Sequence, residues 1–224
     1  MNGNAMSVRV ITLDERGDAL AAKLAEGLPR YLARPCTVSR ARSGQDGELS
    51  ALYAGAFASC DGIVCVMAAG IAVRMLAPLA RSKYEDPAVV VLDDRARWAI
   101  SLLSGHEGGA NELAYAVAAS TGAEPVITTG SETRRTYVLG IGCRRGIGRG
   151  SVAAALAALH AETGLGPADF RCAATIRLKE RETGLIDELA AQGIALRFIE
   201  ERRVNEYDGP YARGGAAEQQ LGVR

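Results

Sequence analysis

The chain has 224 residues, of which 48% are hydrophobic and 23% charged, and its 26 basic side chains balance its 26 acidic ones. At about 100–200 residues per domain, this length predicts one or two globular domains, and the composition excludes a disordered, collagen-like or coiled-coil chain. A chain with a net charge of zero lacks the overall electrostatic attraction to phosphate that nucleic-acid-binding proteins use. We therefore expect no nucleic-acid partner and only a local anion site.

Membrane insertion and export are not expected either. The apolar run at residues 62–75 contains Arg74 and is shorter than the roughly 18 apolar residues of a membrane span. Residues 1–6 lack the basic and apolar regions of a signal peptide. The five cysteines show no C-x-x-C spacing, which favours reduced thiols in a cytoplasmic protein over a disulfide framework or a protein metal site.

Strand and helix patterns alternate through the first 130 residues. Apolar, β-rich runs predict strands, and Ala/Leu-rich stretches with apolar spacing near four predict helices. The charged turn at 93–95 predicts that the strands on either side of it form a hairpin. The predicted strands are 8–13, 63–67, 88–92, 98–103 and 125–129, and the predicted helices are 18–28, 71–79 and 110–120.

A second, smaller unit follows. The polar stretch 131–136 has no apolar periodicity and is the predicted linker, and the chain after residue 200 is polar and expected to be poorly ordered. The fold class is therefore α/β, with two open modules and largely parallel sheets, the N-terminal module being the larger. The expected boundaries are 7–130, 131–136, 137–200 and 201–224. Predicted strands of the second unit are 137–141, 172–178 and 195–199, and predicted helices are 151–163 and 184–191.

The densest candidate site is the Gly-rich turn 104–111, between a predicted strand and a predicted helix. Ligands of open α/β sheets bind beyond the carboxyl ends of strands, where free N–H groups at helix starts favour anions. His106 suits proton transfer at neutral pH, with turn capping as the alternative. Asn111 either holds a substrate carbonyl or caps the helix. Candidate ligand-contacting residues here are Ser104, Gly105, Gly108 and Gly109.

The second candidate is the segment 140–150, again between a strand and a helix. Its glycines fit neither G-x-G-x-x-G nor the phosphate loop G-x-x-x-x-G-K-[ST]. Gly142, Arg144 and Arg145 form an arginine-bearing turn that suits carboxylates or phosphates, with a solvated basic loop as the alternative. Cys143 is a weaker candidate for a nucleophile, because no histidine lies close to it in sequence.

A third stretch adds small residues and a cation. Gly70 lets a ligand approach the backbone closely and Arg74 can face it, although a packing turn with a surface arginine is equally consistent. Thr128 and Thr129 lie at the end of the predicted strand 125–129. We expect the three loops and these threonines to outline one rim of the sheet.

Together these stretches resemble the CbiG family of anaerobic cobalamin biosynthesis. The second unit resembles the family's C-terminal module, which also occurs alone as CobE, and the likeness covers roughly residues 8–200. A middle region that many members carry is replaced by residues 131–136, and the polar end after residue 200 departs from the family pattern. The matching runs are MAAGIAVR (67–74), APL (77–79), DPAVVVLD (86–93), LLSGHEGGANELA (102–114), PVITT (125–129), VLGIGCRRG (138–146) and LKERE (178–182).

The resemblance implies the reaction of a cobalt-precorrin-5A hydrolase, which opens the ring-A lactone of a cobalt corrinoid and releases acetaldehyde. For this reaction, their chemistry and motif position make His106 the candidate general acid or base, and Asn111 with the Gly108 and Gly109 amides the candidate oxyanion donors. Arg144 and Arg145, with Lys179, would bind peripheral carboxylates of the corrinoid. The cobalt belongs to the substrate, so no cofactor or protein-bound metal is expected.

Two other functions remain open from sequence. The Gly-rich loops of a non-catalytic corrinoid carrier would bind the intermediate without reacting it, and a nucleotide-dependent enzyme would use them for phosphates. Expected partners are the corrinoid and other enzymes of the cobalamin pathway. A homodimer is left open as an alternative to a monomer.

Overall fold

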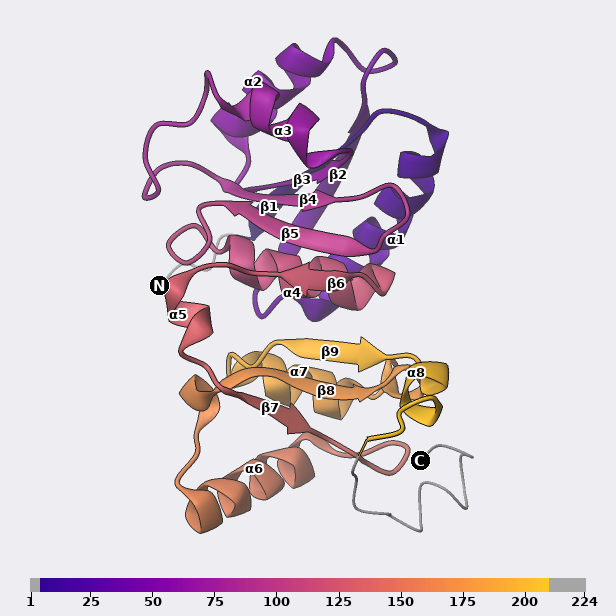
Figure 1. Cartoon of the computed structure of the whole chain (residues 1–224), viewed down its shortest axis with the longest axis vertical. Coiled ribbons are helices and arrows are strands. Elements are labelled where there is room, and N and C mark those ends of the chain that lie inside the picture. The colour runs from indigo at the N-terminus through magenta and orange to yellow at the C-terminus, as the bar shows by residue number, and fades with distance from the viewer. Residues whose placement is uncertain (1–4, 210–224) are drawn as a thin grey trace.

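The computed structural model describes residues 5–209, apart from the side chains of Ser131 and Thr133. Two sheets lie one above the other along the long axis of the molecule (Figure 1). The larger has six strands in the order β2-β1-β3-β4-β5-β6, and the smaller has three in the order β7-β8-β9. The predicted α/β class with largely parallel sheets is confirmed. The expectations for residues 1–4 and 210–224 lie outside the described residues.

The elements of the larger unit run from residue 6 to residue 133. Its strands are β1 (Met6–Thr12), β2 (Cys36–Arg42), β3 (Gly62–Val66), β4 (Ala88–Leu92), β5 (Trp98–Leu103) and β6 (Glu124–Val126). Its helices are α1 (Glu15–Tyr31), α2 (Leu49–Ser59), α3 (Ala69–Leu76), α4 (Ala110–Thr121) and the short α5 (Gly130–Thr133).

The smaller unit follows α5. Its strands are β7 (Tyr137–Gly140), β8 (Phe170–Ile176) and β9 (Leu196–Ile199). Its helices are α6 (Arg149–Thr163), α7 (Thr183–Ala191) and α8 (Glu201–Asn205), with 3-10 turns η1 (Pro167–Asp169) and η2 (Arg177–Lys179).

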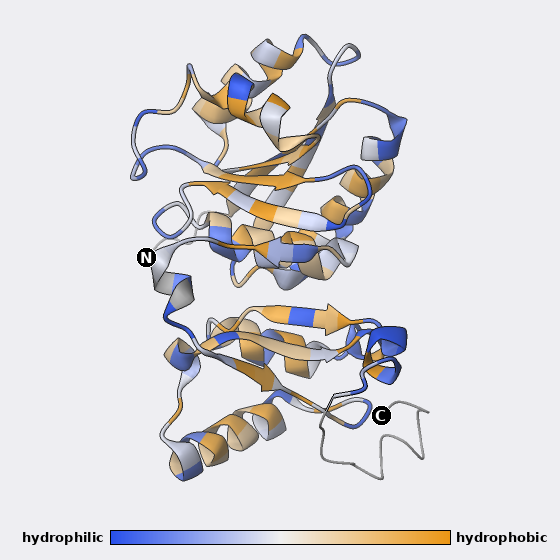
Figure 2. Ribbon diagram, viewed as in Figure 1, coloured by the Kyte–Doolittle hydropathy of each residue, from blue (hydrophilic) through white to orange (hydrophobic). Residues whose placement is uncertain are grey.

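The central strands of the large sheet are apolar on both faces because helices cover both. Alternate β3 side chains enter two clusters: Val64 packs with α1 and α4, and Cys65 packs with α2 and α3. All five residues of β3 and of β4 are buried, as their continuous apolar sequence predicts. Figure 2 shows the hydrophobic residues of these strands, in contrast to the hydrophilic residues of many of the loops.

The hairpin predicted between residues 88 and 103 is confirmed, and it reverses the direction of the sheet. Strands β1 to β4 are mutually parallel where they pair, β5 runs antiparallel to β4, and β6 runs parallel to β5. The segments after β5 and β6 therefore leave the sheet at the edge opposite to the segment after β3. The expectation of one shared rim is wrong for Gly70 and Arg74, which lie on α3 directly after β3.

Three segments differ from the sequence-based assignment. Strand β2 and helix α2 were not predicted. The predicted linker 131–136 begins inside α5, whose backbone bond from the Glu132 N–H to the Thr129 carbonyl is 3.1 Å long. Helix α8 shows that residues 201–205 are ordered, contrary to the expectation for 201–224.

The two units pack through α1 and α4 of the first and β9 of the second. The rings of Tyr31 and Phe198 meet edge to face with centroids 5.5 Å apart, a favourable aromatic geometry. Arg197 forms an ion pair with Glu124, and Arg203 lies 3.7 Å from the same carboxylate. The interface therefore combines an aromatic contact with ion pairs and packs β9, an edge strand of the small sheet, against α1 and α4.

Candidate active site

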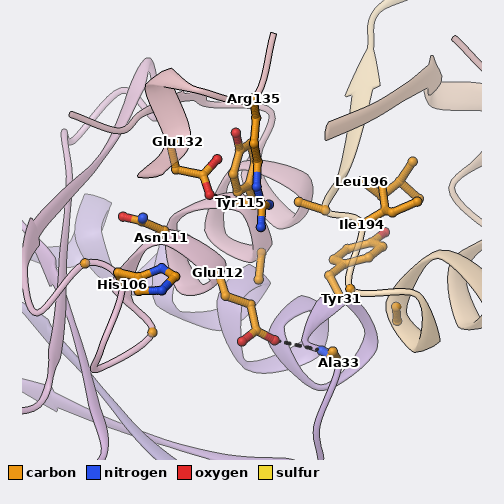
Figure 3. Close-up of a pocket in the computed structure, with 16 residues that line it drawn as sticks. Tyr31, Ala33, His106, Asn111, Glu112, Tyr115, Glu132, Arg135, Ile194 and Leu196 are labelled. Atoms are coloured by element: carbon orange, nitrogen blue, oxygen red, sulfur yellow. Dashed lines mark hydrogen bonds and ion pairs between the residues drawn. The ribbon is translucent and has the colours of Figure 1, made fainter. Parts of the chain in front are cut away.

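A cleft of about 250 Å³ lies between the two units (Figure 3). The turn 104–111 and the first turns of α4 form one wall, and the segment leading into β9 forms the other. Helix α5 and the residues after it close one side. The polar and charged lining residues are Tyr31, His106, Asn111, Glu112, Tyr115, Glu132 and Arg135.

The turn 104–111 is held by backbone bonds that its glycines permit. Gly108 and Ala110 both donate to the Ser104 carbonyl, at 3.1 and 3.2 Å. A Cβ on Gly108 would lie 2.5 Å from the Ser104 Cβ, and Gly109 has φ +88°, so glycine is required at both positions. The Gly108 N–H is used inside the turn, so the oxyanion role expected of it is not supported. Among residues 5–209 the Gly109 N–H makes no such backbone bond.

His106 stands exposed on the cleft wall, and its ring points into the cleft (Figure 3). Within the described part of the chain no hydrogen bond restrains the ring. The neighbouring Glu107 carboxylate is bonded to Lys83 at 2.7 Å, and this bond is the largest cause that lowers the pKa of Glu107. The imidazole is therefore left able to exchange a proton with a bound ligand.

Asn111 is buried and joins three elements. Its Oδ1 accepts a hydrogen bond from the Ser101 hydroxyl on β5, and its Nδ2 donates to the Thr129 hydroxyl after β6, both at 2.8 Å. The side-chain oxygen is thus occupied, and one Nδ2–H remains for a ligand. Thr129 is bonded to Asn111, and neither it nor the exposed Thr128 is in the cleft lining.

Glu132 is a cleft residue that sequence reasoning missed. It is 7% exposed, and its Oε1 lies 3.4 Å from the Arg135 guanidinium. Its Oε2 is buried and has no hydrogen-bond partner among the described residues. The only sequence signal was a pair of opposite charges three residues apart in a stretch interpreted as a linker. Buried carboxylate atoms without partners are costly, and they are uncommon outside functional sites.

Tyr115 adds a phenol to the same wall, next to Glu132 (Figure 3). Burial raises the pKa of this phenol, with smaller contributions from Cys172 and Glu132. The group therefore stays protonated at neutral pH and can donate a hydrogen bond to a ligand oxygen.

The cations at the cleft differ from those expected. Arg135 lines it, and Arg34 lies beside the lining residue Gly109, on which an added Cβ would be 2.9 Å from an Arg34 guanidinium nitrogen. Neither arginine was a sequence candidate. Guanidinium groups at these places can bind carboxylates of a ligand held in the cleft.

The arginine-bearing turn lies elsewhere. It follows the carboxyl end of β7, whereas the cleft is lined by residues preceding β9, and the strands of this sheet are all parallel. Gly142, Arg144 and Arg145 therefore lie at the opposite edge of the small sheet from His106. Lys179 is at that same far edge, 9% exposed and 4.0 Å from Glu182. Binding of carboxylates by these residues stays a prediction, separate from the cleft.

Cys143 shares this remote edge. Burial raises the pKa of its thiol, outweighing the effect of Lys179, so little thiolate is present at neutral pH. We predict that Cys143→Ser turns over any substrate of the cleft at the rate of the parent chain. We also predict that alkylation of the Cys143 thiol accelerates only at a pH above the ordinary pKa of a cysteine thiol. A loss of turnover in Cys143→Ser would identify the thiol as a participant.

No group of three or more His, Cys, Asp or Glu side chains suited to a metal ion occurs among residues 5–209. Within the same part of the chain, no helix has the length and apolar character needed to cross a bilayer.

Comparison with known proteins identifies both halves. Residues 51–132 match the family model "Cobalamin synthesis G N-terminal", and residues 137–224 match "Cobalamin synthesis G C-terminus". The second match extends to residue 224, so the expectation that the likeness ends near residue 200 is corrected. The two models lie in tandem across the predicted linker.

Two curated relatives are named cobalt-precorrin-5A hydrolase. One from Salmonella typhimurium is 41% identical over 138 residues, which are 59% of this chain and 38% of that protein. One from Priestia megaterium is 48% identical over 90 residues, which are 40% of this chain and 24% of that protein. The matched regions thus span well under half the length of these relatives.

A solved structure of a cobalamin biosynthesis protein G homologue from Sulfolobus solfataricus is 18% identical, with a TM-score of 0.43 and coverage of 97% of this chain and 86% of that one. The family assignment depends on the two sequence models, which together match most of the chain. The chain therefore belongs to the CbiG family, with its N-terminal and C-terminal modules in tandem.

Proposed function

We propose that the chain is a cobalt-precorrin-5A hydrolase, which opens the ring-A lactone of a cobalt corrinoid and releases acetaldehyde to give cobalt-precorrin-5B. The names of its relatives support this activity. The observation that carries the proposal is the cleft between the units, in which the unrestrained His106 ring faces buried polar groups. The five free cysteines support a cytoplasmic location.

His106 would act first, on water. It accepts a proton as the water oxygen attacks the lactone carbonyl carbon, and the ring C–O bond then breaks. The water oxygen ends in the new carboxyl group, and the former ring oxygen leaves as a hydroxyl that takes up a proton. The free Gly109 N–H and the second Nδ2–H of Asn111 are the donors available for the oxyanion.

The size of the cleft determines how the substrate can approach. A volume of about 250 Å³ is below the roughly 300–1,000 Å³ of sites that enclose whole small molecules, so a corrinoid would enter by one edge. Arg34 and Arg135 would then meet acetate or propionate carboxylates near the ring-A edge. The cobalt ion travels with the substrate, and the proposed reaction uses no other cofactor.

The test is anaerobic incubation of the purified chain with cobalt-precorrin-5A, with trapping of acetaldehyde and measurement of the corrinoid mass. The proposal expects stoichiometric acetaldehyde and a corrinoid that has gained one water and lost the two-carbon fragment. A corrinoid that stays bound with unchanged mass would contradict it and would favour the carrier function instead.

A further inference from the structure

The buried carboxylate of Glu132 is not used by the ring-opening step. It is fixed from two directions: Arg135 holds Oε1, and the Thr129 carbonyl accepts the Glu132 backbone N–H at 3.1 Å. Thr129 is itself anchored to Asn111. Oε2 is left buried without a hydrogen-bond partner among the described residues, on the wall of the cleft. Glu132 also lines a second cavity of about 150 Å³ beside the first.

We propose that Glu132 is the catalytic acid–base residue of acetaldehyde release, and that His106 serves the preceding hydrolysis. This inference rests on the proposed function. In the second step the hydroxyl formed by ring opening gives its proton to Oε2 of Glu132. The C–C bond to the macrocycle breaks, its electron pair stays with the macrocycle, and the fragment leaves as acetaldehyde. The proton then passes to the macrocycle, so no outside oxidant or reductant is needed.

The different surroundings of the two groups support this division of roles. Hydrolysis consumes water, and His106 is the exposed group, reached by solvent at the cleft wall. The second step moves a proton between two positions of one bound molecule, and a group shielded from bulk water suits such a transfer. Glu132 is 7% exposed. Its Oε2 has no hydrogen-bond partner among the described residues and can accept a proton.

The contact with Arg135 stabilises the buried carboxylate of Glu132. A carboxylate buried without a counter-charge is strongly disfavoured, and the guanidinium at 3.4 Å compensates the charge of Glu132. Because Arg135 contacts Oε1, Oε2 is left without a partner among the described residues and can accept a proton from the substrate. The neighbouring Tyr115 phenol can donate to the aldehyde oxygen as it forms.

The two steps give products of different mass, so they can be separated. We expect Glu132→Gln, which keeps the shape but cannot accept the proton, to convert cobalt-precorrin-5A to the ring-opened hydroxy acid, heavier by one water. Its acetaldehyde release should fall by at least about 100-fold. Glu132→Asp keeps a carboxylate on a shorter stem and should restore part of the release. His106→Ala should accumulate neither product.

Glu188→Gln is the matched control. Glu188 is also a buried glutamate paired with an arginine, Arg149 at 2.7 Å, but it lies on α7 outside the cleft lining. This variant should release acetaldehyde at the parental rate. Thermal unfolding of all variants shows which are folded, and Glu132→Asp carries the test if Glu132→Gln does not fold.

Acetaldehyde release by Glu132→Gln at the parental rate would overturn the inference. So would a folded Glu132→Gln that forms no ring-opened acid, because Glu132 would then act in the first step or in binding. Failure of the proposed function gives a different result, in which the parent chain itself leaves the corrinoid mass unchanged.

Discussion

Replacing His106 with alanine is expected to lower the rate of lactone opening by about 100- to 10,000-fold, the usual contribution of a general acid–base group. The imidazole makes no hydrogen bond within residues 5–209 and is exposed, so its removal should leave the unfolding temperature nearly unchanged. Affinity for the corrinoid should also persist, because the arginines at the cleft are untouched. Acetaldehyde release and corrinoid mass under anaerobic single-turnover conditions measure the effect.

The control for this variant is His160→Ala. His160 lies on α6 of the other unit, and its Nδ1 is 3.1 Å from the Leu165 carbonyl, remote from the cleft lining. It should retain the parental rate. Equal rates for His106→Ala and the parent would remove the assignment of His106 as the group that activates water.

Replacing Asn111 with alanine is expected to impair both stability and turnover. The substitution removes two partly buried hydrogen bonds, which at about 1 kcal/mol each lower the free energy of unfolding by about 2 kcal/mol. For a chain of this length that corresponds to an unfolding temperature lower by roughly 4–8 °C. Because Thr129 leads directly into α5, loss of its bond to Asn111 should also loosen Glu132 and reduce acetaldehyde release.

Ser101→Ala separates the two effects. It removes the bond between β5 and Asn111 but leaves the bond to Thr129, so it should cost about 1 kcal/mol and keep most of the turnover. Thermal unfolding and acetaldehyde release are measured on the same samples. Stability and turnover of Asn111→Ala equal to those of the parent would show that Asn111 neither joins the three elements nor positions α5.

The strands of the core were predictable because burial on both faces leaves a direct mark in the sequence. β3 and β4 are continuous apolar runs with every residue buried. β2 was missed because it lies at the edge of the sheet and mixes Thr37, Ser39 and Arg40 with apolar residues. Helix α2 was missed because it is apolar around most of its circumference while only Tyr53 and Ala56 are buried, which gives no clear helical period.

The site was predicted in part. The turn 104–111 lies in the cleft as its strand–glycine–helix pattern indicated. The hairpin at 88–103 was also predicted, and its antiparallel pairing places the end of β5 at the opposite edge of the sheet from α3. The edge at which each segment leaves the sheet depends on the directions of all the strands, and a hairpin pattern gives only the direction of its own two strands. The arginine-bearing turn at 144–145 belongs to the small sheet, and its separation from the cleft depends on how the two units pack, which no local pattern reports.

Glu132 shows the other limit of sequence reasoning. A polar segment with no apolar period is ordinarily exposed, and residues 131–136 were interpreted in that way. Burial of Glu132 arises from tertiary packing, because α5 lies against the cleft beside Tyr115 and Arg135. No local pattern reports such a contact, so the buried oxygen could be found only from the structure.

The central claim, that the corrinoid binds in the cleft between the two units, is tested most directly by hydrogen–deuterium exchange with and without cobalt-precorrin-5A. The structure predicts that bound substrate slows exchange in peptides covering 104–116 and 190–196, which line the cleft, and leaves 141–149 unchanged. Protection confined to 141–149, with free exchange in the cleft peptides, would contradict the account and place the substrate at the far edge of the small sheet.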